Sequence, residues 1–340
     1  MRIGILTGGG DCAGLNQAIR AAVMRSLDFG NECLGVLEGW RGLIEGKTTS
    51  LGLKEVEGII EKSGTILGTS RTNPYQEEEG AKKVKENIKK LGLEALVAMG
   101  GEDTLGVARK LFEEGVKVVG VPKTMDNDLS ATDYTFGFDS SVTRALEAAS
   151  VLIDTGRSHR RVMILEVMGR HAGWVALFTG IASGADWILL PERKPEIEEM
   201  IKHIRAVHSR KNYALIVTSE GITLPEQKVG AEDQDKFGHM ILKKRKMGET
   251  LAKLVEEKTG LEARVLVIGH MQRGGVPSLF DRILATRCGV KAAELVKEGK
   301  FGQMVALRGN EIVEVSLKEA TAKLKLVDDA WWNFAKVFFK

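Results

Sequence analysis

The sequence predicts an α/β protein with two mainly parallel sheets, each flanked by helices. Short apolar runs, typical of buried parallel strands, alternate with helical patterns along the chain. The alternation forms two series, one within residues 3–121 and another within residues 162–268. Glycines and acidic residues follow several of the apolar runs directly, at the position where open α/β sheets bind ligands. We therefore expect two Rossmann-like lobes with ligands at the carboxyl ends of their strands.

Each series contributes four predicted strands. In chain order they are residues 3–6, 33–37, 96–99, 118–121, 162–167, 187–190, 213–218 and 264–268. The charged, amphipathic stretch 81–91 is one of the helices expected between them. Residues 222–247 combine Pro and Gly with dense charge and predict a surface excursion. The apolar stripe at residues 331–339 predicts a helix that packs on a lobe or a subunit.

The bulk composition narrows the class of protein. A chain of 340 residues with 43% hydrophobic and 28% charged residues is typical of globular proteins. A net charge of +3, with no basic run interleaved with aromatics, argues against nucleic-acid binding. The three cysteines are scattered without metal-ligand spacing, and we find neither a signal peptide nor an apolar span. We expect a cytoplasmic protein.

The segment 122–128, Pro-Lys-Thr-Met-Asp-Asn-Asp, places two carboxylates and a lysine directly after the predicted strand 118–121. A carboxylate beside an ammonium group suits removal of a proton from a hydroxyl next to bound phosphate, because the lysine charge stabilises the anion that forms. A solvated turn with local Asp and Asn hydrogen bonds is the alternative interpretation.

The segment 100–104, Gly-Gly-Glu-Asp-Thr, lies between the strand 96–99 and a helical pattern at 105–112. Paired glycines let backbone amides approach a ligand, and a helix N-terminus favours phosphate. Acidic residues fit such a site if a magnesium ion lies between them and the phosphate. Ordinary capping of the helix is the alternative.

The segment 7–16, Thr-Gly-Gly-Gly-Asp-Cys-Ala-Gly-Leu-Asn, joins the first strand to a helical pattern. Strand, glycine-rich loop and helix form a phosphate cradle, although this loop has neither the dinucleotide spacing nor the P-loop lysine. One such loop is weak evidence. Three strand-to-helix junctions with glycine or acid together indicate a phosphoryl-transfer site.

Six ordered segments of the chain resemble the 6-phosphofructokinase family: residues 7–16, 67–71, 100–104, 122–128, 166–170 and 269–275. The resemblance implies a phosphoryl-donor lobe at residues 1–137 plus about 273–315. It implies a sugar-phosphate lobe at residues 138–272 plus about 316–340, with two phosphorylated ligands between the lobes. It also implies Mg²⁺ as the cofactor and fructose 6-phosphate as the acceptor.

The resemblance further implies a role for each matching residue. Asp126 is the base that takes the proton of the sugar 1-hydroxyl, with Thr124 in support. Arg71 and Arg170 neutralise phosphoryl oxygens. The implied donor-binding residues are Gly9, Gly10, Glu102, Asp103, Thr104 and Lys123, with Glu102 as the magnesium ligand. The implied substrate-binding residues are Thr124, Asp126, Asp128, Arg161, Met168, Gly169, Arg170, Glu220, Arg264, His270 and Arg273.

Arg161 and Arg264 match residues that the family supplies across a subunit interface. Sharing a site in this way requires at least a dimer. The chain lacks most of the arginines with which allosteric bacterial relatives bind effectors. We therefore expect weak or absent nucleotide regulation.

Two residues predict the phosphoryl donor. Family members that use ATP usually carry glycine where this chain has Asp103 and Lys123, whereas pyrophosphate-dependent members resemble this chain. Asp103 adds bulk and negative charge where a nucleotide α-phosphate would lie, and Lys123 suits the terminal oxygens of a short diphosphate. We expect a pyrophosphate-dependent fructose 6-phosphate 1-phosphotransferase. An ATP-dependent enzyme, a non-catalytic sugar-phosphate sensor, and activity on sedoheptulose 7-phosphate remain alternatives.

Overall fold

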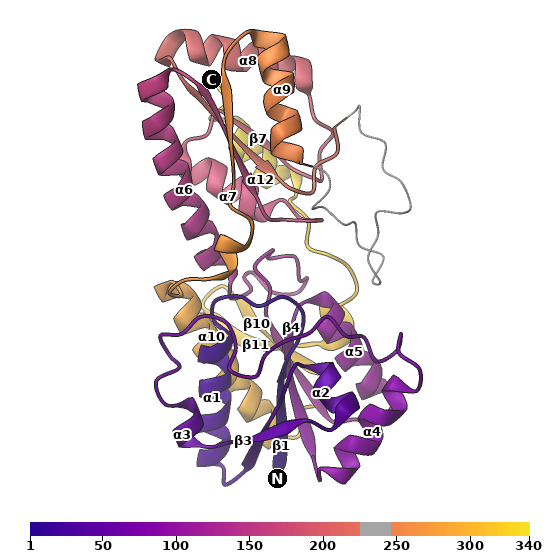
Figure 1. The fold of residues 1–340 in the computed structure, drawn as a ribbon. Helices are drawn as coiled ribbons and strands as arrows, with labels where there is room; N and C mark the ends of the chain where they lie inside the picture. Colours follow the sequence, from indigo (N-terminus) through magenta and orange to yellow (C-terminus); the bar gives the residue numbers. More distant parts are fainter. Residues whose placement is uncertain (225–245) are drawn as a thin grey trace. The chain divides into compact units, whose positions relative to one another are not determined.

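The computed structural model describes residues 1–224 and 246–340, so most of the predicted surface excursion at 222–247 lies outside the described residues. The chain divides into two compact units (Figure 1). The first unit comprises Met1–Ser140 and Arg273–Lys325, and the second comprises Ser141–Gln272 and Leu326–Lys340. Each unit contains one sheet with helices around it, which confirms the predicted fold class.

The first unit contains a seven-stranded sheet in the order β11-β10-β5-β4-β1-β2-β3. The strands are β1 (Arg2–Thr7), β2 (Glu32–Val36), β3 (Thr48–Leu51), β4 (Ala95–Gly100), β5 (Val118–Pro122), β10 (Gln303–Arg308) and β11 (Glu311–Ser316). The inner pairs are parallel, and only β2–β3 and β10–β11 are antiparallel. The sequence predicted β1, β2, β4 and β5 but missed β3, β10 and β11.

Both faces of this sheet are buried, as the continuous apolar runs predicted. Ile3 and Ile5 face one core and Leu6 faces the other, following the two-residue period of a strand. On the first face, α1 (Leu15–Asp28) and α10 (Leu279–Lys297) pack against each other (Figure 1). The opposite core contains side chains from α2 (Trp40–Glu45), α4 (Gly80–Lys90), α5 (Glu102–Glu113) and α11 (Leu317–Ala320). The short helix α3 (Leu53–Val56) contacts α1 and β3.

Residues 316–325 belong to the first unit, whereas the sequence analysis placed them in the second. The physical reason is burial. Leu317 and Ala320 of α11 are fully buried in the same core as Leu105 of α5. The chain therefore enters the second unit only at Leu326.

The second unit contains a parallel sheet in the order β7-β8-β6-β9. Its strands are β6 (Val162–Val167), β7 (Trp187–Leu189), β8 (Ala214–Ser219) and β9 (Ala263–Val267), and the sequence predicted all four. Its helices are α6 (Phe138–His159), which contains the division between the units, α7 (Trp174–Ser183), α8 (Ile197–Lys211), α9 (Met247–Thr259) and α12 (Asp329–Lys336). The side chains of α8 and α9 fill the core against β6 and β8.

The predicted C-terminal apolar helix is α12, and it packs on the second unit as expected. The Trp331 ring lies 6.2 Å from Trp174 and 5.0 Å from Phe178 of α7, measured between ring centroids. None of the helices in the described ranges combines the length and the apolar character needed to cross a membrane.

Candidate active site

The glycine-rich loop between β1 and α1 is closely approached from two other parts of the first unit. A Cβ on Gly8 would lie 2.6 Å from Thr104 Oγ1, and one on Gly10 would lie 2.5 Å from Arg273 Nη1. Gly9 also has a φ of 81°, which side chains other than glycine rarely adopt. Gly8 and Gly9 are therefore constrained to glycine, Gly10 lies against the end of the Arg273 side chain, and the loop lies at the carboxyl ends of the strands.

The segment that carries Arg71 is bonded to the same loop. The Gly9 amide donates to Ser70 O at 3.0 Å, and Thr69 Oγ1 donates to Gly9 O at 2.7 Å. The Ser70 hydroxyl in turn donates to Glu38 O. These bonds place the exposed Arg71 beside the phosphate-loop candidate, although the two are about 60 residues apart in the chain.

Lys123 follows β5 and lies beneath the glycine-rich loop. Its side chain is 3% exposed, and its ammonium group donates to Gly10 O. Its backbone amide donates to Gly100 O at 3.0 Å. Burial lowers the pKa of Lys123, while the charges of Asp11 and Asp126 act in the opposite direction. The structure thus brings the lysine to both glycine segments that the sequence singled out.

The acidic pair Glu102–Asp103 forms the first turn of α5, with Gly101 as the N-cap. Glu102 is half-buried, Asp103 is exposed, and Thr104 behind them is 3% exposed. A Cβ on Gly100 would lie 2.3 Å from Thr104 Cβ, so glycine is needed to let the helix begin this close to the strand. Capping and ligand binding are both compatible with this position.

The two aspartates after Lys123 are held in an unusual electrostatic environment. In residues 1–224 and 246–340, the buried Oδ1 of Asp126 has no hydrogen-bond partner, although the Asp126 amide donates to Thr124 Oγ1 at 3.1 Å. Burial, followed by the charges of Asp126 and Glu102, raises the pKa of Asp128 to about 7. Three carboxylates therefore share one edge of the sheet, and a buried carboxylate oxygen that lacks a partner needs a proton or a cation.

The three carboxylates Glu102, Asp126 and Asp128 could also take part in binding a magnesium ion. No group of three His, Cys, Asp or Glu side chains in the described parts of the chain is arranged to hold a metal ion. Magnesium that arrives with a diphosphate needs only one or two protein carboxylates, because phosphate oxygens and water supply the other ligands. The clustered charge of Glu102, Asp126 and Asp128 fits an ion bound in that way.

In the second unit, the predicted residues after β6 and β8 lie at one edge of its sheet. Gly169 has a φ of 137°, and a Cβ on it would lie 2.8 Å from Ala172 O. The Met168 amide donates to Gln272 Oε1 at 2.7 Å, and the Ser219 hydroxyl donates to Gly169 O. Glu220 follows directly, with its amide donating to Val167 O at 2.9 Å. Arg170 is the next residue after this glycine turn.

Arg161 and Arg264 lie at the amino ends of the strands of the same sheet, opposite the residues that follow β6 and β8. Arg161 precedes β6, and Arg264 is the second residue of β9. Both guanidinium groups contact Glu262, with Arg161 Nε donating to its Oε2 at 2.6 Å. A strand of six residues separates Arg161 from Met168, which corresponds to about 20 Å. Within one chain, these two arginines therefore do not join the residues that follow β6.

Comparison with known proteins agrees with this architecture. A family profile described as Phosphofructokinase matches residues 2–296. The chain belongs to the phosphofructokinase family. It is 51% identical to a pyrophosphate–fructose 6-phosphate 1-phosphotransferase of Streptomyces coelicolor and 46% identical to ATP-dependent 6-phosphofructokinase 3 of the same organism. The first alignment covers 100% of both chains, and the second covers 97% of both chains.

The fold is shared with solved phosphofructokinases. The structure of a pyrophosphate-dependent phosphofructokinase from Marinobacter aquaeolei superposes with a TM-score of 0.82 at 23% identity, covering 96% of this chain and 86% of that one. At this identity the match shows the fold alone. Four curated relatives between 49% and 51% identical carry the pyrophosphate–fructose 6-phosphate name.

In this phosphofructokinase, Arg273 directly follows Gln272, whose side chain accepts from the Met168 amide. It begins the second segment of the first unit, and its Nη1 donates to Asp11 O at 2.9 Å. His270 is exposed on the short 3₁₀ helix η3 (Gly269–Arg273) of the second unit. The roles assigned to both residues stay predictions.

Sequence reasoning missed Lys325. This residue lies far along the chain, yet it bonds to the loop that contains Asp126 and Asp128. The sequence around Lys325 is only a polar stretch between α11 and the apolar C-terminal helix, and it does not point to the loop of Asp126 and Asp128 about 200 residues earlier.

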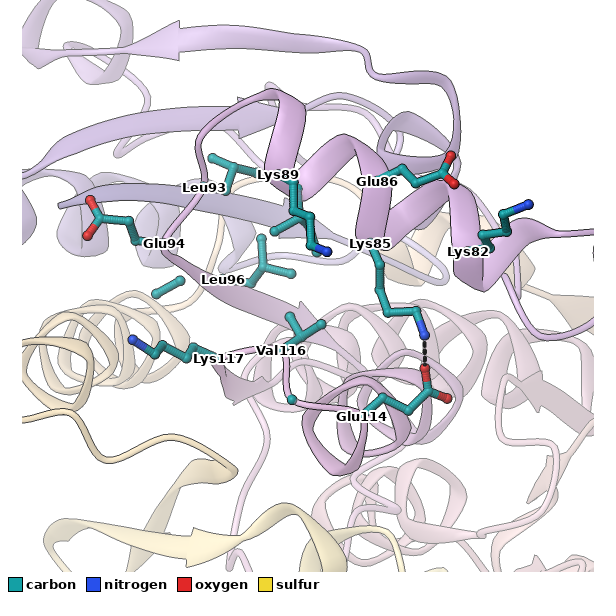
Figure 2. A pocket seen from close by; sticks show the side chains of 13 residues that line it. Lys82, Lys85, Glu86, Lys89, Leu93, Glu94, Leu96, Glu114, Val116 and Lys117 are labelled. Carbon is teal, nitrogen blue, oxygen red and sulfur yellow. Dashed lines mark hydrogen bonds and ion pairs between the residues drawn. The ribbon is translucent and has the colours of Figure 1, made fainter.

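A pocket of about 520 Å³ lies at the amino ends of β4 and β5 in the seven-stranded sheet of the first unit. Figure 2 shows Lys85 of α4 reaching Glu114 at the end of α5, and the ion pair measures 2.7 Å. Lys89, Lys117 and the apolar side chain of Leu96 line the same pocket. None of the predicted site residues lines it.

Proposed function

We propose that this phosphofructokinase transfers a phosphoryl group from pyrophosphate to the 1-hydroxyl of fructose 6-phosphate, giving fructose 1,6-bisphosphate and phosphate. The observation that carries the choice of donor is the pair Asp103 and Lys123 at one edge of the first unit. The transfer is reversible, because the donor anhydride and the product ester are close enough in energy for both directions to proceed. The names of the relatives near 50% identity support this choice.

The donor argument depends on placement. Asp103 is exposed at the start of α5, in the path that the rest of a nucleotide would follow beyond two phosphates. Its negative charge repels a third phosphate and its side chain takes up space there. Lys123, buried beneath Gly10, supplies positive charge to a compact diphosphate resting on the loop. Gly9, Gly10 and Thr104 complete the donor surface.

In the reaction, the 1-hydroxyl oxygen attacks the terminal phosphorus, and the bond from that phosphorus to the bridging oxygen breaks. The Asp126 carboxylate takes the hydroxyl proton, while the displaced phosphate leaves with the bridging oxygen. Lys123, Arg71 and Arg170 counter the negative charge on the phosphoryl oxygens. Thr124 holds the backbone of the base through its hydroxyl.

Glu102 would hold the magnesium ion that accompanies the diphosphate. Bound magnesium neutralises phosphate charge and orients the transferring group. The residues of the chain then have one further task, which is to hold the Asp126 carboxylate close to the acceptor. Burial, and after it the charge of Asp126, raises the pKa of the neighbouring Asp128.

The sugar phosphate would bind to the second unit through the residues after β6 and β8 and on η3. These are Met168, Gly169, Arg170, Glu220 and His270. Arg161 and Arg264 lie at the far edge of that sheet, so we propose that they serve the site of a neighbouring subunit in a homo-oligomer. All three cysteines are free and buried, which fits a reducing compartment such as the cytoplasm.

The test is a comparison of initial rates with magnesium pyrophosphate and magnesium ATP, using fructose 6-phosphate as the acceptor. We expect product only, or overwhelmingly, with pyrophosphate. Comparable or greater activity with ATP would favour the second candidate, which the 46% identical ATP-dependent relative keeps open. Binding of fructose 6-phosphate without product from either donor would point to a sugar-phosphate sensor.

The acceptor needs a separate measurement. Fructose 6-phosphate and sedoheptulose 7-phosphate should be compared by kcat/KM in single-substrate assays and in competition. The proposal expects a preference for fructose 6-phosphate. A higher kcat/KM for sedoheptulose 7-phosphate would make that sugar the acceptor and would leave the proposed donor unchanged.

A further inference from the structure

Lys325, the last residue of the first unit, bonds to the loop that follows β5. Its Nζ donates to Asn127 Oδ1 at 3.0 Å, to Thr132 O at 3.0 Å and to Asp133 O at 2.8 Å. Its backbone amide donates to Asp128 O at 2.7 Å. One residue from the C-terminal part of the chain thus contacts four positions of a single loop.

The loop needs such support because two of its residues other than glycine have positive φ, Asn127 and Ala131, the latter with a φ of 64°. Asn127, between the two aspartates, has a φ of 52° and is 2% exposed. Its Oδ1 accepts from the Thr135 amide at 3.1 Å as well as from Lys325. Residues in the left-handed region persist when surrounding contacts hold them there. Thr135 Oγ1 also donates to Thr124 O at 2.6 Å, which closes the network.

The segment that delivers Lys325 is itself anchored to the loop. Leu324 forms an antiparallel bridge with Leu129, and Ser130 Oγ donates to the carbonyl oxygens of Glu319 and Ala320 in α11. Burial lowers the pKa of Lys325 to about 8, while the charges of Asp133 and Asp128 act in the opposite direction. The group is therefore mainly a protonated ammonium with three donors near pH 7.

We propose that Lys325 is a positioning residue that fixes the loop 124–133, so that Asp126 and Asp128 are held in the arrangement that phosphoryl transfer requires. The inference rests on the catalytic role proposed above for Asp126. Lys325 touches no reacting atom in this account. It acts through Asn127 and the backbone of the loop.

The proposal predicts a specific kinetic defect. Without the ammonium group, three oxygens lose a donor and Asn127 loses one of the two bonds that hold its side chain. A displacement of about 1 Å of a reacting group can cost about 100-fold in rate. Lys325→Met should therefore lower kcat by about 10- to 100-fold, with KM for pyrophosphate and fructose 6-phosphate close to wild type. Steady-state kinetics on both substrates measure this.

Lys323→Met is the matched control, because Lys323 is exposed on the same segment two residues earlier. It should behave as wild type. Chemical rescue separates positioning by charge from simple packing. Propylammonium replaces the atoms removed by Lys325→Ala and should restore part of kcat, whereas 1-propanol, of the same shape without the charge, should not. Equal rescue by both compounds, or wild-type kcat in Lys325→Met, would overturn the proposal.

A second variant covers the case in which Lys325→Met does not fold. Asn127→Gly keeps a residue that accepts positive φ while removing the oxygen through which Lys325 acts. It should lower kcat with little change in KM, and in a double-mutant cycle its effect should not add to that of Lys325→Arg. Full additivity would refute the connection between the two side chains.

The outcomes also separate this inference from the proposed function. If Asp126→Asn retains wild-type activity, the catalytic assignment fails whatever Lys325 does. If Asp126→Asn is inactive while Lys325→Met is fully active, the positioning role alone fails.

Discussion

The two ends of the seven-stranded sheet carry similar residues in different surroundings. At the carboxyl ends of β4 and β5 are Glu102 and Lys123, and at their amino ends are Glu94 and Lys117. Lys123 is 3% exposed and lies beneath a glycine-rich loop, whereas Lys117 lines an open pocket beside the paired Lys85. The presence of charged residues therefore does not distinguish the candidate site from the amino ends of the strands. The burial of Lys123 at the carboxyl ends does.

The physical basis of the difference is solvation. Exposed ion pairs such as Lys85–Glu114 contribute little, because water screens them and long side chains lose freedom in forming them. At the carboxyl edge, burial raises the pKa of Asp128 and lowers that of Lys123, so their charges are costly without a ligand. Such tension is typical of a site that a charged substrate completes.

The largest effect should come from the base. Asp126→Asn removes the proton acceptor while keeping the shape of the side chain, and it should lower kcat by about 10²- to 10⁴-fold. Glu86→Gln, at the amino edge, is the control and should leave kcat unchanged. The measurement is kcat of both variants and the wild type in the forward direction, at saturating pyrophosphate and fructose 6-phosphate. A decrease of less than tenfold in Asp126→Asn would remove the distinction between the two edges.

The donor preference should change next. Replacing both Asp103 and Lys123 with glycine should lower kcat/KM for pyrophosphate by about 10- to 100-fold, because a buried charge partner of the diphosphate is lost. The ratio of ATP to pyrophosphate activity should rise. Lys117→Gly is the control, since Lys117 precedes the same strand that Lys123 follows. An unchanged ratio in the double variant would contradict the steric and electrostatic account of donor choice.

Stability should depend on pH through Asp128. Its folded pKa of about 7 exceeds the ordinary value of 3.8, so the folded state binds more protons between these values. Stability of the unliganded protein should therefore fall as the pH rises from about 4 to about 7. Burial raises the pKa of Asp281 to about 6 and acts in the same direction over a narrower range.

Asp128→Asn should consequently raise Tm at pH 8 by a few degrees, on the order expected for about 1 kcal/mol or more, and should do so much less at pH 5. Thermal unfolding of both proteins at the two pH values measures this. Equal changes at both pH values would mean that the carboxyl group of Asp128 is not destabilised in the folded state.

The smallest effect should come from the amino edge. Lys85→Met breaks an exposed ion pair and should change the free energy of unfolding by at most about 1 kcal/mol, with no change in kcat or KM. Urea unfolding and kinetics on the same preparation measure both quantities. A clear loss of activity would show that the pocket at this edge influences the catalytic edge.

Periodicity in the sequence predicted eight of the strands, because buried parallel strands are continuous apolar runs whatever surrounds them. It missed β3 and β11, which pair antiparallel at the two edges of the first sheet, and also β10, which lies between β11 and β5 and pairs parallel with β5. Residues such as Thr48–Leu51 are strand only because β2 offers a partner. Their partners lie elsewhere in the chain, and local pattern does not reveal them.

The sequence by itself predicted the strands that precede the candidate site and the segments proposed to carry its chemistry, since glycine, acid and lysine directly after apolar runs reflect local requirements of backbone and charge. Tertiary structure alone decided which of these groups are buried and that Arg273 lies against Gly10. It also decided that Lys325 holds the loop around Asn127. Solvation, pKa and mutual support depend on residues brought together from distant parts of the chain, so they appear only once the chain has folded.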